Sequence, residues 1–202
     1  MDAPIRTARL VLSPVEAEDA DELAAVFADE RLYAFTGGRP GTVEELRGTL
    51  GRLARERAGD PWAQRNWVVR RLADRQAVGM LQAAFGGGGR SAEIAWLVGV
   101  PWQGQGLASE AAAAVVGWLE ARGVAQVTAW IRPDHHASEA VATRAGLMVT
   151  SETRTTDTHE HLERLWRRDL APGGRRGTTV RRAAELGAPG AVAPSGENGG
   201  VG

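Results

Sequence analysis

Alternating apolar and polar positions predict strands in several parts of the chain. In the run over 8–13, Leu10 and Leu12 would share one face, which is typical of a half-buried strand. Similar or more continuous apolar runs predict further strands over 66–72, 76–85, 91–100, 124–131, 147–152 and 161–168. The links at 73–75 and 86–89 are short and polar or glycine-rich, which indicates an antiparallel meander in the middle of the chain.

Apolar residues spaced three and four apart predict helices between these strands. Asp19 is expected to be the N-cap of the first helix. Thr42 and Glu45 form a capping-box pattern that opens a second helix. Two more helices are expected over 104–122 and 138–144, each followed closely by a glycine.

The order of these elements predicts an α/β fold. The segment 91–132 reads strand, helix, strand, and two strands joined by a crossover helix are parallel. A meander followed by a crossover gives one mixed sheet. From Ala171 onward the chain is rich in Gly, Pro, Ala and Arg and has few large apolar residues. We therefore expect one domain over 1–170 and a disordered tail over 171–202.

Composition excludes several classes of protein. A hydrophobic share of 43% allows a real core, and a formal net charge of −1 does not give the basic surface of a nucleic-acid-binding protein. The chain has no cysteine, so it forms no disulfide and has no thiolate nucleophile. It has no signal-peptide pattern at its start and no run approaching about 18 apolar residues. We expect a cytoplasmic protein that binds neither nucleic acid nor membrane.

The most informative segment is Gln103-Gly104-Gln105-Gly106-Leu107-Ala108, which joins an apolar strand to an amphipathic helix. Glycines let the backbone turn sharply, and the N–H groups at the start of a helix attract an anion. A pyrophosphate suits such a turn. Two other phosphate-binding motifs are weakened: the dinucleotide-binding fingerprint because Ser109 replaces its third glycine, and the P-loop because the chain has no lysine.

The residues around this turn resemble those of the GNAT acetyltransferases, and most closely the RimJ/RimL-like branch that acetylates the N-termini of ribosomal proteins. The branch signature Gln/Arg-x-x-Gly-x-Gly/Ala is matched by Gln103, Gly106 and Ala108, and Pro101 precedes it. His135-His136-Ala137-Ser138 stands at the place of the family's Asn-x-x-Ser element.

Two further segments extend the resemblance to about residues 6–170. Ala145-Gly146-Leu147 matches the family's Gly-Leu/Phe pair, and the opening Arg9-Leu10-Val11-Leu12 with Asp19-Ala20 is also similar to this branch. The resemblance implies a GNAT acyl-CoA N-acyltransferase fold, in which helices flank a central twisted mixed sheet. It also implies that the strands on either side of the glycine turn splay apart.

The resemblance implies that acetyl-CoA, the co-substrate of these enzymes, lies in the splay. Its pantetheine arm would pair with backbone of Leu97, Val98, Gly99 and Val100. The implied pyrophosphate turn consists of Gln103, Gly104, Gln105, Gly106, Leu107, Ala108 and Ser109. His135 stands where the family usually has Asn; because a His side chain also donates a hydrogen bond, we expect it to serve there.

Two residues are candidates for catalysis. Glu93 is the candidate base, acting on the amine directly or through water, and its alternative role is that of a solvated strand residue. Ser138 is the candidate proton donor to the leaving sulfur, and its alternative role is to cap the helix at 138–144. A backbone N–H near Val98 would stabilise the oxyanion. Many GNAT enzymes use a Tyr as the acid; Tyr33 is the chain's only one, and we expect it to line the acceptor site or to pack.

The expected reaction is acetyl transfer to a primary amine by direct attack. The acceptor is either a protein N-terminus or a small-molecule amine, and a homodimer is left open. No metal is expected, since His135-His136 and His159-Glu160-His161 lack further ligands at suitable spacing. The competing hypothesis is a non-catalytic acyl-CoA-binding module, regulatory or interacting, on the same fold.

Overall fold

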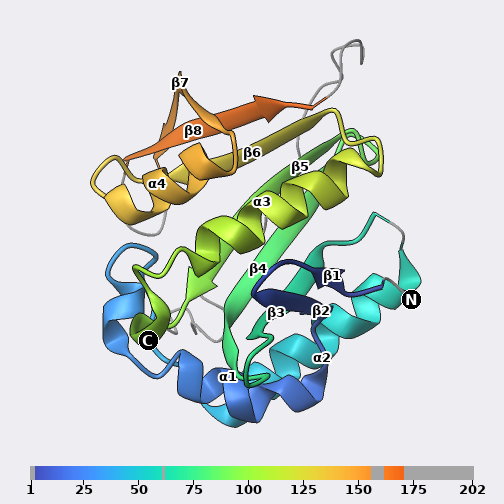
Figure 1. Ribbon diagram of the computed structural model, residues 1–202, viewed down its shortest axis with the longest axis vertical. Helices are drawn as coiled ribbons and strands as arrows, with labels where there is room; N and C mark the ends of the chain where they lie inside the picture. The colour runs from blue at the N-terminus through green and yellow to red at the C-terminus, as the bar shows by residue number, and fades with distance from the viewer. Residues whose placement is uncertain (1–2, 61, 156–161, 171–202) are drawn as a thin grey trace, which may run out of the picture.

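The computed structural model describes residues 3–60, 62–155 and 162–170. Its centre is an eight-stranded sheet in the order β1-β2-β3-β4-β5-β6-β8-β7 (Figure 1). The strands are β1 (Ile5–Arg6), β2 (Leu10–Pro14), β3 (Arg65–Arg71), β4 (Ala77–Gly86), β5 (Ser91–Val98), β6 (Gln126–Ile131), β7 (Met148–Thr155) and β8 (Leu162–Asp169). The helices are α1 (Ala20–Val26), α2 (Val43–Gly59), α3 (Leu107–Glu120) and α4 (His136–Arg144), with short 3-10 turns η1 (Ala17–Asp19), η2 (Glu30–Tyr33) and η3 (Val100–Trp102).

The sheet is mixed, as the sequence predicts. β5 and β6 are parallel and are joined by the crossover helix α3, whereas the other neighbouring strands are antiparallel. The predicted meander corresponds to β3, β4 and β5. The α/β fold class is confirmed, with one helix pair on each face of the sheet.

Two apolar cores lie on the two faces. α3 and α4 cover one face, where Trp67, Leu81 and Ile94 of three neighbouring strands are buried against them. α1 and α2 cover the other face, where Val68 and Met80 are buried. Because side chains alternate along a strand, residues one apart in β3 or β4 enter different cores.

Both α1 and α2 begin at their predicted N-cap residues, but only α2 has a side-chain cap. The Thr42 hydroxyl accepts the N–H of Glu45, and the Glu45 carboxylate accepts the N–H of Thr42. Asp19 does not cap α1 with its side chain. Its carboxylate instead accepts a hydrogen bond from the backbone N–H of Glu16, which closes η1. It also accepts a hydrogen bond from the Arg70 guanidinium. Asp19 is thus the N-cap residue of α1, as predicted, but its side chain binds Glu16 and Arg70 and not the first N–H groups of the helix.

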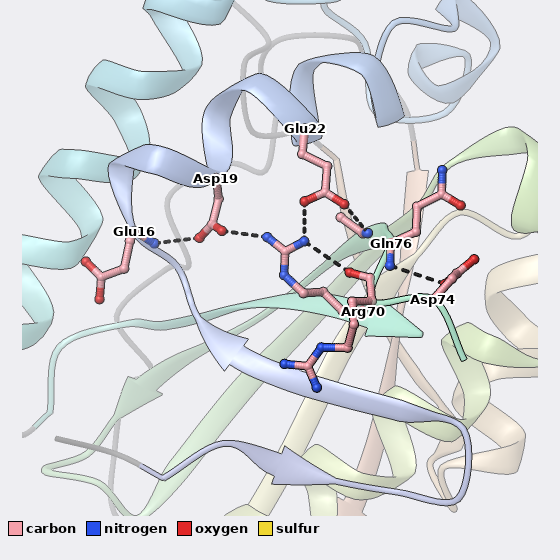
Figure 2. Close-up of polar contacts among 8 residues, drawn as sticks. Glu16, Asp19, Glu22, Arg70, Asp74 and Gln76 are labelled. Atoms are coloured by element: carbon pink, nitrogen blue, oxygen red, sulfur yellow. Dashed lines mark hydrogen bonds and ion pairs between the residues drawn. The ribbon is translucent and has the colours of Figure 1, made fainter. Parts of the chain in front are cut away.

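A group of charged residues joins α1 to the hairpin between β3 and β4 (Figure 2). The Arg70 guanidinium donates to Asp19 at 2.7 Å and to Glu22. Glu22 also accepts the backbone N–H of Ala77, the first residue of β4. Burial of Glu22 would raise the pKa of its carboxyl, but the hydrogen bonds from Ala77 and Arg70 outweigh it and lower the pKa. We call Asp19, Glu22 and Arg70 the α1 anchor.

Two predictions fall on residues that the structure does not describe. The expected tail over 171–202, and with it the 1–170 boundary, lies outside the described residues. The histidines at 159 and 161 also lie outside them. Within the described ranges, no helix combines the length and apolar character needed to cross a membrane.

Candidate functional site

β5 and β6 separate partway along their length. Their register pairs Ser91 with Gln126 and ends with Glu93 opposite Thr128. β5 continues to Val98 and β6 to Ile131, so the later part of each strand faces an opening between them. This is the splay that the resemblance implies, and Glu93 lies where it begins.

β5 is shorter than predicted. It ends at Val98, and Val100 starts η3, so Gly99 and Val100 are not part of the strand. The N–H of Gly99 donates to Val78 of β4 at 2.9 Å. Because backbone groups alternate between the two edges of a strand, the N–H groups of Val98 and Trp96 face the opposite edge, toward the splay.

The glycine turn lies at the carboxyl end of β5. Gly104 and Gly106 have φ of 74° and 75°, a left-handed conformation that side chains with a Cβ adopt only at a cost. Gly106 is the N-cap of α3, and no described side chain accepts a hydrogen bond there. The first N–H groups of α3 therefore have no intrahelical partner and point toward the turn, which is the donor set that suits a pyrophosphate.

The side-chain amides of the two glutamines in this turn donate hydrogen bonds to backbone carbonyls of the protein itself. Gln103 Nε2 donates to the carbonyl of Val98 at 2.9 Å, and Gln105 Nε2 donates to the carbonyl of Pro101 at 3.0 Å. Gln103 thus ties the turn to the end of β5. Because the side-chain nitrogens of both residues already have acceptors, these residues would contact a ligand through their backbone N–H groups.

Arg9 and Glu110 support the turn from outside, and the sequence did not single them out as site residues. Arg9 donates to Glu110 at 2.6 Å and to the carbonyl of Gln105 at 3.0 Å. Glu110 also accepts the Thr7 hydroxyl. Burial would raise the pKa of Glu110, but these hydrogen bonds lower it, so the carboxylate stays charged. The only signal in the sequence was the opening Arg9-Leu10 element of the resemblance.

His135 and Ser138 lie at the start of α4, which follows β6 as α3 follows β5. Because β5 and β6 are parallel, the starts of both helices lie at the same edge of the sheet. The N-cap of α4 is His135, with Ser138 inside the first turn, so the alternative role of Ser138 as the helix cap is wrong. The Ser138 hydroxyl lies 3.5 Å from His135 Nε2.

The ring of His135 is held by an aromatic contact that was not predicted. It stacks on Phe35 with a centroid distance of 4.0 Å and an interplanar angle of 2°, and Arg132 lies over the same Phe35 ring at 5.3 Å. Burial lowers the pKa of His135, with Arg132 adding to the effect and Asp134 opposing it. The imidazole is therefore neutral at pH 7 and keeps one nitrogen as donor and one as acceptor.

Glu93 is not a solvated strand residue, because only 8% of it is exposed. It lies on the sheet face away from α3, as do its register neighbours Ala84 and Thr128. Val98 is five positions further along β5, or about 16 Å along an extended strand. A ligand that contacts both Glu93 and the glycine turn must therefore be elongated.

The structure also bears on the expected role of Tyr33 and on the possibility of a metal site. Tyr33 packs in the core under α1 and α2, where its hydroxyl donates to the carbonyl of Phe27 at 3.0 Å. Of the two roles expected for it, the structure supports packing. Within the described ranges, no three His, Asp or Glu side chains gather as a metal site would require.

Comparisons with known proteins agree with this geometry. The model of a family described as an acetyltransferase (GNAT) domain matches residues 9–148. No curated protein matches the chain at the sequence level.

Many solved structures share the fold. RimL, the ribosomal L7/L12 α-N-protein acetyltransferase, in complex with coenzyme A, is 17% identical over 83% of this chain and 98% of that chain, with a TM-score of 0.72. A ribosomal-protein-S5-alanine acetyltransferase from Vibrio fischeri is 14% identical over 85% and 98%, with a TM-score of 0.73. An acetyl transferase from Salmonella typhimurium that modifies the N-terminal serine of L7/L12 is 17% identical over 84% and 100%, with a TM-score of 0.71. At these identities the likeness shows a shared fold.

Proposed function

Because the chain belongs to the GNAT acetyltransferase family, whose domain matches residues 9–148, we propose that it transfers an acetyl group from acetyl-CoA to a primary amine at the splay between β5 and β6. The observation that carries this proposal is the opening of the β5–β6 register after Glu93, directly beside an uncapped helix start. An elongated opening that ends at anion-binding N–H groups suits a long thiol arm attached to a pyrophosphate.

The chain's own residues would hold the coenzyme from two sides. Backbone groups of β5 up to Val98 form an open strand edge along the splay, and an extended arm binds such an edge as an added strand does. The N–H groups from Gln105 to Ser109 bind the pyrophosphate, and Arg9, which is paired with Glu110, holds the carbonyl of Gln105 beside them. His135 approaches from the start of α4.

In the proposed reaction, the amine nitrogen attacks the thioester carbonyl carbon and the carbon–sulfur bond then breaks. Glu93 takes the proton that the amine must lose, directly or through water, because an ammonium has no lone pair with which to attack. Ser138 donates a proton to the departing sulfur and regains one from solvent. A thiol pKa near 8.5 makes the thiolate a fair leaving group, so a weak donor suffices.

The position of Glu93 favours a different oxyanion donor from the one expected. Val98 lies about 16 Å along the strand from Glu93, which is a long way for Glu93 to reach an amine that attacks an acetyl group held at Val98. The N–H of Trp96 faces the same open edge and lies closer to Glu93. We therefore assign the oxyanion to Trp96, with a water between Glu93 and the amine.

Two classes of acceptor fit this proposal, a protein N-terminus and a small-molecule amine. The first is supported by the named activities of the structural relatives, which act on the N-termini of ribosomal proteins. Both classes supply a primary amine to the same chemistry.

Calorimetric titration with acetyl-CoA tests the proposal, with NAD and ATP as controls. We expect micromolar-range binding of acetyl-CoA and none of the controls, followed by transfer to at least one member of a panel of amines. No binding of acetyl-CoA would overturn the proposal. Binding without transfer to any amine would favour the non-catalytic module.

A further inference from the structure

A row of polar side chains crosses the sheet on the face that carries Glu93. Asn66 of β3, Gln82 of β4 and Ala95 of β5 are directly opposite one another in the register. Residues directly opposite across antiparallel strands share a face. The next line of the register contains Ala84 and Glu93, two residues further from α1 and α2.

The change from apolar to polar on this face is abrupt. One step in the other direction, Val68, Met80 and Leu97 are opposite one another and pack in the apolar core under α1 and α2. The fold therefore accommodates apolar side chains at neighbouring positions of the same strands. Nothing in the sheet itself calls for carboxamides at 66 and 82.

The two carboxamides are buried and each has an amide nitrogen without a hydrogen-bond partner. Asn66 and Gln82 are each only 4% exposed. Asn66 Oδ1 accepts from Gln64 Nε2 at 3.0 Å, but no described group accepts from Asn66 Nδ2 or from Gln82 Nε2. An unmet buried donor costs about 1–3 kcal/mol, and these two lie on residues directly opposite each other in neighbouring strands.

We propose that Asn66 and Gln82 recognise the acceptor by donating to a carbonyl oxygen beside its reactive amine. The free groups are N–H donors, so their partner must be a hydrogen-bond acceptor. They are neutral, which suits a neutral carbonyl better than a carboxylate or phosphate, for which a charged donor binds more strongly. The proposal rests on the proposed function, because it takes Glu93 as the group that faces the amine.

The spacing in the sheet selects the position of that carbonyl. Gln82 is opposite Ala95, and Glu93 is the diagonal neighbour two residues away, at about 7 Å. An α-aminoacyl group carries its amine and its carbonyl on the same carbon, so it spans this short interval. A lysine side chain or a simple alkylamine has no carbonyl near its amine.

The acceptor class assigned by this geometry is therefore an α-aminoacyl compound, such as the N-terminus of a peptide. Asn66 and Gln82 are residues that determine specificity; they take no part in proton transfer.

The test compares three acceptors in the full-length protein: an alanine-initiated tripeptide, isopropylamine and Nα-acetyllysine amide. The variants are Gln82→Met and Asn66→Leu, which remove the donors and keep similar volume. For each acceptor, kcat/KM of the variant is divided by that of the wild-type protein, so differences in amine pKa cancel. Met80→Leu, on the same strand and face, is the control variant.

We expect each donor variant to lower kcat/KM for the tripeptide about tenfold, as loss of one hydrogen bond does, and to change it less than twofold for the other two acceptors. The unfolding free energy should be unchanged or higher, because an unmet donor has been removed. Met80→Leu should affect all three acceptors equally.

An equal loss on all acceptors, or no loss on the tripeptide, would overturn the inference. So would a drop in stability without a change of selectivity, because that result would give the carboxamides a structural partner. Wild-type protein that acetylates isopropylamine but not the tripeptide would refute this inference and leave the proposed function standing. Wild-type protein that does not bind acetyl-CoA would refute both.

Discussion

Glu93 and Ser138, the proposed base and acid, lie at different places in the fold, and we expect their loss to affect catalysis differently. Glu93 lies where β5 and β6 part, whereas Ser138 lies in the first turn of α4, beyond the end of β6. The proposed base removes the proton of the ammonium group before the amine attacks, and without that step no attack occurs. The proposed acid acts on a sulfur that already leaves readily.

Glu93→Gln should lower kcat by about 10²–10⁴, the range typical for loss of a general base. Ser138→Ala should lower it by only about tenfold. Both variants should bind acetyl-CoA as the wild-type protein does, and calorimetry checks this. Unchanged turnover of Glu93→Gln on the preferred acceptor would remove Glu93 from the mechanism.

Gly106 should matter to the coenzyme more than any side chain in the turn. Gly106→Ala places a Cβ on a backbone with φ of 75°, which costs about 1 kcal/mol and moves the first N–H groups of α3. We expect the Kd for acetyl-CoA to rise about tenfold.

Gly117 provides the matched control for this glycine because it lies within α3 and has no atom within 4 Å of an added Cβ. Gly117→Ala should leave the affinity unchanged and slightly raise stability. Equal affinities for the two variants would show that the conformation of the turn is not needed for binding.

At the scale of elements, the close approach of β4 and β5 sets the position of the open strand edge. A Cβ on Gly79 would lie 2.1 Å from the carbonyl oxygen of Leu97. Gly79→Ala must push the two strands apart, and we expect the unfolding free energy to fall by about 2 kcal/mol in urea denaturation. Gly48→Ala in α2, where an added Cβ meets nothing within 4 Å, should instead raise it by about 0.5 kcal/mol. A Gly79→Ala protein as stable as Gly48→Ala would contradict the packing described.

The α1 anchor ties α1 to β3 and to the first residue of β4 (Figure 2). Arg70→Met leaves Asp19 and Glu22 without their shared cation, and we expect a loss of about 2 kcal/mol at pH 7. Arg47→Met removes an exposed ion pair between α2 and Asp21 and should cost less than about 0.5 kcal/mol. Denaturation of both variants measures the difference.

The same anchor predicts a dependence of stability on pH. The pKa of Glu22 is lower in the folded protein than its ordinary value of 4.5, so its contribution is present above that pH and is lost as the pH falls through the folded value. The gap in stability between wild type and Arg70→Met should therefore narrow below about pH 4.5. A gap that stays constant to pH 3 would show that Glu22 is not charged in the anchor.

At the scale of the whole molecule, the described strands and helices end at Asp169, and Leu170 packs against the core of α3 and α4. The matched family domain ends earlier, at residue 148. A chain of residues 1–170 should therefore keep the Tm of the full protein within about 2 °C and bind acetyl-CoA with the same Kd. Thermal denaturation and calorimetry on both chains test this. A lower Tm would give 171–202 a place in the folded structure.

The sequence by itself determined the elements and their order. The apolar runs of β3 to β5, the Thr42–Glu45 capping box and the glycines at 104 and 106 act through neighbouring residues, so local patterns in the sequence predict them. The strand–helix–strand order around α3 also determined that β5 and β6 would be parallel, because a crossover connection permits nothing else.

Only the tertiary structure decided which distant side chains meet. The carboxylate of Asp19 turns to Arg70 instead of capping α1, and Phe35 stacks on His135, because folding brings together groups that are far apart in the chain. The buried, unpaired amide nitrogens of Asn66 and Gln82 are likewise a result of the tertiary structure. The burial of these two side chains and their lack of a hydrogen-bond partner depend on the strand register and on what covers each face of the sheet. Neither can be read from a single sequence.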